Sequence, residues 1–181
     1  MITITIDGTD RSGIVQFGSV QKMDVINKET DTLTFFIVYH AGQTFRPESG
    51  SEVIMYDGVT KTFGGIIYAT QKENEGNGSV KYTVKCKDYS YELGKLLVND
   101  EFTNSTVGEI IEDVIDAYTT GFTYANVSCD ISVSKIVFDR ISVVDVLNKL
   151  SDASGFSWYV DYERDIHFFE KNTEPAPFNI S

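Results

Sequence analysis

The amino-terminal half of the chain is patterned as consecutive β-strands. In residues 2–6, isoleucine alternates with threonine, which is typical of a half-buried strand. Residues 33–39 are almost wholly β-branched or aromatic, so we expect a strand covered on both faces. Further strands are expected at residues 14–17, 20–26, 52–56 and 61–68. Asp57-Gly58 predicts a tight hairpin turn between the last two of these strands.

The return strand of that hairpin contains Gly64-Gly65, which predicts a bulge or a sharp bend. After a turn at residues 74–78 comes a strand of strict alternation. Val80, Tyr82, Val84 and Cys86 share one face of it, and Lys81, Thr83, Lys85 and Lys87 share the other. Six or seven such strands predict a small barrel or sandwich that ends near residue 88, followed by a short helical connector at residues 88–98.

From residue 104 the hydrophobic period becomes helical. Thr106-Val-Gly-Glu109 is a capping box, which predicts a helix from Val107 to a stop at Gly121. A second capping box, Ser142-Val-Val-Asp145, predicts a helix that ends at Gly155. Apolar residues at helical spacing in both segments predict that each helix buries one face against a core.

Short strands are expected around these helices, at residues 127–133 and 136–138 and in a hairpin of residues 156–162 and 166–170. The second half is therefore predicted to be α+β, with two helices covering one face of a short sheet. The fold class is mixed β and α+β. We expect a β-barrel domain with its connector at residues 1–98 and an α+β domain at residues 99–181.

Composition and charge narrow the possible functions. The chain has 181 residues, of which 41% are hydrophobic, enough to fill a core. Its net charge of −12 opposes the electrostatic attraction on which nucleic-acid binding depends, so no sequence-specific nucleic-acid binding is expected. We expect no membrane insertion, because no apolar run reaches the roughly 18 residues of a membrane helix. The amino terminus lacks a secretory signal pattern, so the protein is expected to be cytoplasmic when it is made.

No local signature of catalysis or metal binding is present. Cys86 and Cys129 have no metal or redox spacing and are expected to be buried thiols. His40 and His167 lie in strand patterns, and we expect packing or surface roles for both. We expect no cofactor, no metal and no enzymatic activity.

Two sets of side chains keep other functions open. Asp161, Glu163 and Asp165 cluster at the last hairpin, where ordinary turn chemistry explains them better than a small hydrolase does. Trp158, Tyr159 and Tyr162 could form a sugar-stacking platform, although such residues more often form the core of a small sheet. A carbohydrate- or receptor-binding module is therefore the alternative function.

A series of motifs in fixed order extends from about Phe63 to Ile180. The motifs are Gly64-Gly-Ile-Ile-Tyr68, Tyr82-Thr-Val-Lys-Cys-Lys-Asp88, Phe102-Thr-Asn-Ser-Thr106, Val107-Gly-Glu-Ile-Ile111, Ile136-Val-Phe138, Asp145-Val-Leu-Asn-Lys-Leu150, Gly155-Phe-Ser-Trp-Tyr-Val-Asp161 and Asp165-Ile-His-Phe-Phe169. This series resembles the amino-terminal region of bacteriophage tail hub proteins, the family of baseplate hubs and tail-associated lysins.

The resemblance implies a virion structural protein at the tail tip or baseplate. In that family a β-barrel joins a homotrimeric ring that closes the tail tube, contacts a distal tail ring protein and opens to let DNA pass. Family members continue into further domains, whereas this sequence stops at Pro175-Ala-Pro177-Phe-Asn-Ile-Ser181, in what resembles the start of another strand. We therefore expect that the chain is part of a longer hub.

Lys81, Thr83, Lys85 and Lys87 are the candidate interface residues. Such a stripe is usually a solvated strand face, and lysines also protect exposed sheet edges. A basic stripe on an acidic chain also complements the surface of another copy or of a ring partner.

Overall fold

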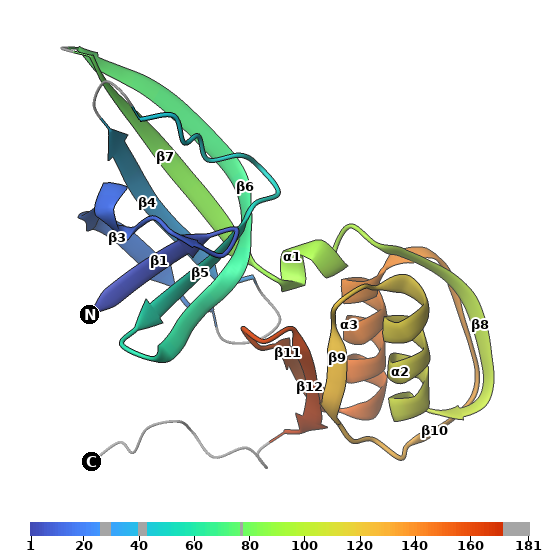
Figure 1. Ribbon diagram of the computed structural model, residues 1–181. Coiled ribbons are helices and arrows are strands. Elements are labelled where there is room, and N and C mark those ends of the chain that lie inside the picture. Colours follow the sequence, from blue (N-terminus) through green and yellow to red (C-terminus); the bar gives the residue numbers. More distant parts are fainter. Residues whose placement is uncertain (26–29, 40–42, 77, 172–181) are drawn as a thin grey trace. The chain divides into compact units, whose positions relative to one another are not determined.

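The computed structural model describes residues 1–25, 30–39, 43–76 and 78–171 (Figure 1). The chain divides into two compact units, Met1–Tyr91 and Glu92–Ser181. The chain is mostly β, with few helices. Within the described ranges, none of the helices has the length and apolar character needed to cross a membrane. His40 and the strand expected at 175–181 lie outside the described residues.

The first unit is a seven-stranded antiparallel sheet in the order β2-β1-β5-β6-β7-β4-β3. Its elements are β1 Ile2–Ile6, β2 Thr9–Asp10, the 3-10 helix η1 Ser12–Ile14, β3 Val15–Met23, β4 Thr32–Tyr39, β5 Glu52–Asp57, β6 Thr60–Gly76 and β7 Ser79–Asp88. The sheet curls into a half-barrel (Figure 1). Its terminal strands β2 and β3 do not pair with each other in the described part of the chain.

The buried face of the half-barrel follows the alternation of the strands. In β1, Ile4 and Ile6 are buried, and in β7 the apolar face predicted from the sequence is buried from Tyr82 to Cys86. The hairpin predicted at Asp57-Gly58 is confirmed, because Asp57 pairs with Thr60 and Gly58 has a positive φ of 61°. The strands expected at 14–17 and 20–26 form one strand, β3, and Ile26 lies outside the described residues.

Two details of the first unit differ from what the sequence predicted. Strand β4 alternates between buried and half-buried positions, so it is not covered equally on both faces. Its second face carries Phe36, which is half-buried and whose ring centre lies 5.1 Å from the Lys81 ammonium. The register shifts of β6 lie on either side of Gly64-Gly65, not at it. Gly65 instead lies in β6 between β5 and β7, and the backbone of β7 comes close to its α-carbon.

The second unit holds two helices and two small sheets. Its elements are α1 Ser90–Leu93, which begins in the first unit, β8 Leu97–Thr106, α2 Val107–Tyr118, β9 Thr123–Val127, β10 Ser132–Ser142, α3 Val143–Ser154, β11 Phe156–Val160 and β12 Asp165–Glu170. Strands β8 and β10 pair antiparallel. Strands β11 and β12 form the predicted hairpin, and β9 joins β12 in parallel.

Helices α2 and α3 lie between these two sheets (Figure 1). The prediction of one sheet with helices on one face is therefore wrong. The core draws side chains from both sheets, including Phe102 and Phe138 from one and Trp158 and Phe168 from the other. The helical connector expected at 88–98 is also wrong beyond Leu93, because β8 begins at Leu97.

Both helices begin where their caps predict. Thr106 accepts a hydrogen bond from the Glu109 amide, and the Glu109 carboxylate accepts one from the Thr106 amide at 2.7 Å, which completes the capping box. Ser142 accepts from the Asp145 amide at 3.1 Å, and its hydroxyl donates back to the Asp145 carboxylate. Helix α3 ends at Gly155 as predicted, with φ of 77°. Helix α2 ends at Tyr118, before the expected stop at Gly121.

Candidate functional site

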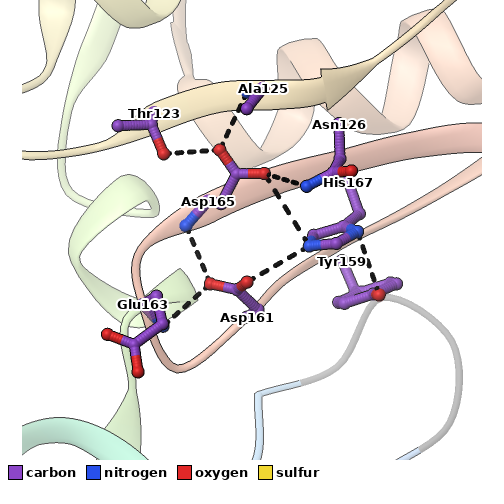
Figure 2. A network of polar contacts seen from close by, with 8 residues as sticks. All are labelled: Thr123, Ala125, Asn126, Tyr159, Asp161, Glu163, Asp165 and His167. Atoms are coloured by element: carbon purple, nitrogen blue, oxygen red, sulfur yellow. Dashed lines mark hydrogen bonds and ion pairs between the residues drawn. The ribbon is translucent and has the colours of Figure 1, made fainter.

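The turn between β11 and β12 is built by the Asp161 side chain. Its Oδ1 accepts hydrogen bonds from the backbone amides of Glu163 at 2.8 Å and Asp165 at 2.9 Å (Figure 2). Arg164, in the same turn, has a positive φ of 67°. An aspartate that binds amides two and four residues ahead stabilises a tight turn. The sequence-based interpretation of this acidic cluster as turn chemistry is thus confirmed for Asp161.

Asp165 joins β12 to the parallel strand β9. Its buried carboxylate accepts hydrogen bonds from the Thr123 hydroxyl, from the Ala125 amide at 2.9 Å and from the Asn126 side-chain amide at 2.7 Å. Burial, the largest single influence, raises the pKa of Asp165, but these hydrogen bonds together hold it below its ordinary value. The carboxylate therefore stays ionised and fixes β9 against the hairpin.

His167 completes the network from the same face of β12. Its Nε2 lies 3.2 Å from Asp161 Oδ2 and 3.8 Å from Asp165 Oδ2, and its Nδ1 lies 3.0 Å from the Tyr159 hydroxyl. The Tyr159 ring stacks on the imidazole with 4.4 Å between centroids. Because Nε2 faces only carboxylate oxygens, it carries the proton, which it donates to Asp161.

Asp161, Asp165 and His167 also have the composition of a metal site, since their ligand atoms lie within 4.8 Å of one another. Each of these atoms already has a protein partner. Nε2 carries a proton that a metal would displace, and Asp165 Oδ2 accepts from Asn126. The geometry is that of a satisfied structural network, which holds a hairpin and a parallel strand together.

The sequence pointed to Asp161, Glu163 and Asp165 but missed the role of His167. A spacing of two residues places Asp165 and His167 on one face of a strand, and that signal could have joined the histidine to the cluster. Thr123 and Asn126 could not be found locally, since they reach the site through the parallel pairing of β9 with β12.

The proposed aromatic platform does not form as a surface. Trp158 is only 3% exposed, and its indole nitrogen donates to Asn148 Oδ1 at 3.0 Å. Tyr159 is 40% exposed but covers the His167 ring. Tyr162 is half-buried. Stacking of a sugar would need an exposed aromatic face, which Trp158 does not offer.

The candidate interface residues of β7 lie together on one strand face. Lys81 pairs with Glu73 at 2.7 Å, and the Lys87 ammonium lies 5.2 Å from the Tyr68 ring and 4.8 Å from the Tyr91 ring. Lys85 is exposed and Thr83 is half-buried. Strand β7 pairs with β6 and β4, so these lysines do not protect a sheet edge. Their role at an interface stays a prediction.

Both cysteines are buried free thiols, as predicted. Burial raises the pKa of each thiol, so neither has the thiolate character of a reactive cysteine. Cys129 has a structural role through its carbonyl, which accepts from the Gly108 amide at 3.0 Å in the first turn of α2.

No protein-family model and no curated protein matches the sequence. Solved structures of similar fold nevertheless cover almost the whole chain. The 43 kDa tail protein of prophage MuSo2 from Shewanella oneidensis is 12% identical, with a TM-score of 0.71 over 93% of this chain and 52% of its own. Prophage tail protein gp18 from Listeria monocytogenes is also 12% identical, with a TM-score of 0.69 over 99% of this chain and 56% of its own.

A third similar structure comes from a secretion system. The Escherichia coli c3393 protein is 14% identical, with a TM-score of 0.63 over 94% of this chain and 49% of its own. It is a component of the type VI secretion system with structural similarity to the T4 bacteriophage tail proteins gp27 and gp5. The present chain thus spans about half the length of the structures it matches. The expected resemblance to tail hub proteins is confirmed at the level of the fold.

Proposed function

We propose that this protein is a structural component of a phage-type tail, located at the tail tip or baseplate hub of the virion. The observation that carries the proposal is the extent of the fold match. The match to one prophage tail protein covers 93% of this chain, and the match to another covers 99%. The match therefore includes the half-barrel, both helices and the two small sheets. A fold supports many functions, so the specific role needs its own test.

In the finer form of the proposal, the chain assembles into a homotrimeric ring that closes the tail tube and lets DNA pass. The half-barrel, with residues 1–98 as its domain, forms the ring, and residues 99–181 form a separate α+β domain. The ring contacts a distal tail ring protein and other tail proteins. The net charge of −12 supports passage of DNA without retention, because a negative wall repels phosphate.

The proposal is tested on tails purified from a strain that produces them. The chain should be present in the tails, and chemical cross-linking should join its copies into trimers but into no larger homo-oligomers. Cross-linked dimers alone, or absence of the chain from tails that are otherwise complete, would contradict it. Assembly in the host cytoplasm predicts trimers in lysates taken before particle release.

The alternative function is a carbohydrate- or receptor-binding module. Trp158, which was to stack on a ligand in that module, is buried in the core. A glycan array probed with the purified chain should give no specific binding.

An enzymatic role is also not supported by the polar network, because its carboxylates accept hydrogen bonds from protein donors. Purified protein should not clear cell walls. Clearing that is lost in Asp161→Asn would overturn the proposal of a non-enzymatic role.

A further inference from the structure

The connection between β4 and β5 presents an exposed arginine whose neighbours in the chain are hydrogen-bonded or buried. In this connection, residues 43–50, the Phe45 carbonyl accepts a hydrogen bond from the Tyr39 hydroxyl. Pro47 is buried, and the Gly50 amide donates to the Ile67 carbonyl at 2.8 Å. Arg46 lies between these fixed points and is exposed. We call this segment the strap.

A second guanidinium lies against the strap. The guanidinium carbon of Arg11 is 3.9 Å from the centre of the Phe45 ring, and its Nε is buried without a hydrogen-bond partner. Arg46 Nη1 donates to the Tyr82 hydroxyl at 2.8 Å. Within the described ranges neither arginine has an ion pair, whereas Arg164 pairs with Glu92 at 2.6 Å.

These two arginines have the features of an interface anchor. Each is packed against an aromatic ring or hydroxyl, so little side-chain freedom remains to be lost on binding. Arginine supported by aromatic side chains is the residue type enriched at binding hot spots. A planar guanidinium without a carboxylate partner in an otherwise acidic chain leaves its charge available to an external carboxylate.

The matching negative surface lies on α2. The helix Val107–Tyr118 contains no basic residue, and Glu112 and Asp113 have no ion pair in the part of the chain that the structure describes. The pKa of Tyr124 is raised first by its hydrogen bond to Asp116, then by the charge of Asp116 and by burial, and least by the charges of Glu112 and Asp113.

We propose that Arg11 and Arg46 of one copy bind the Glu112 and Asp113 face of α2 on a second copy. The two surfaces are different, so the contact is heterologous, and its repetition generates a ring when the rotation closes. The inference rests on the proposed ring assembly and names its contact. DNA phosphate is the weaker occupant, because the net charge of −12 opposes it.

A charge swap tests this contact. Reversing the arginines (R11E with R46E) or the acids (E112R with D113R) should weaken self-association at least about tenfold, because like charges then face each other. Combining all four substitutions should restore it. The control, R140E with K149E, makes the same change in net charge as the arginine reversal, at exposed positions, and should leave association near the parental level.

Association is measured by sedimentation on variants whose melting and circular dichroism match the parent. If a reversed variant fails to fold, Arg46→Gln alone, which keeps the Arg11 packing, should still weaken association. If the folded reversed variants associate as the parent does, this contact is wrong but the ring proposal stands. The same holds if association is lost and the variant with all four substitutions does not restore it. The arginines would then bind DNA or another partner. A parent that does not associate overturns the ring proposal and this contact together.

Discussion

At Gly65 the backbones of β6 and β7 come so close that a side chain has no room. A β-carbon built there would lie 2.1 Å from the Lys87 carbonyl oxygen and 2.8 Å from the Asp88 α-carbon. Gly65→Ala should therefore force the strands apart and destabilise the fold by about 1–3 kcal/mol or more. Gly13→Ala, where nothing lies within 4 Å, is the matched control. Equal denaturation midpoints for the two variants would contradict this close approach.

Asp165 should make stability depend on pH. Because its folded pKa lies below the unfolded value of about 3.9, the ionised group contributes stability above that value, which is lost as pH falls through the folded pKa. Asp165→Asn should cost about 1.5–3 kcal/mol at pH 7, the usual range for hydrogen bonds to a charged group, and less in acid.

Urea unfolding of parent and Asp165→Asn from pH 7 to pH 3 checks this expectation. The two stability curves should converge as the pH falls. Asp139→Asn, at an exposed position, should follow the parent throughout. A constant difference between Asp165→Asn and the parent would show that the carboxylate's charge does not stabilise the network.

At the scale of elements, the helices carry the core of the second unit. Leu147 of α3 is fully buried, so Leu147→Ala should destabilise by about 2–5 kcal/mol. Leu97→Ala, at a side chain that is 59% exposed, should change stability by less than about 0.5 kcal/mol. Chemical denaturation measures both. A small effect at Leu147 would mean that the apolar stripe of α3 is not in the core.

The helices and the last hairpin were predictable because their signals are local. Caps at Thr106 and Ser142 fixed where the helices begin, and the apolar stripes fixed their buried faces. Strand β8 was missed because it is mostly polar and buries only Val98 and Phe102, four residues apart. Residues four apart share one face of a strand and also one face of a helix, so this spacing does not distinguish the two. The strand exists because β10 pairs with it, from Thr106 opposite Ser132 to Leu97 opposite Ser142.

The polar network was only partly predictable for the same reason. Asp161 acts within its own turn, so turn chemistry identified it. Asp165 acts across strands, and its partners come from β9, whose parallel pairing with β12 has no local signature. Thr123 and Asn126, which bind Asp165 from about 40 residues away in the sequence, could not be assigned a role from the pattern alone.

At the scale of the whole molecule, the β7 lysines give a further prediction about assembly. Changing Lys81, Lys85 and Lys87 to glutamate should weaken association while the fold persists. The exposed Lys85 should contribute most, because Lys81 is engaged by Glu73. Raising salt from 0.1 M to 1 M should weaken the parent's association, since the Debye length falls from about 10 Å to about 3 Å. If light scattering gives the triple variant the same oligomer mass as the parent, the lysines belong to a solvated strand face and not to an interface.

The central claim is that the chain is part of the ring that closes a tail tube. Electron cryo-microscopy of intact tails, with the chain's position marked by a fused tag, tests it most directly. The account predicts three copies around a central channel at the tail tip, each with the half-barrel in the ring wall. Density for this fold in the tail shaft or in a peripheral fibre, or a tip ring built without it, would contradict the claim.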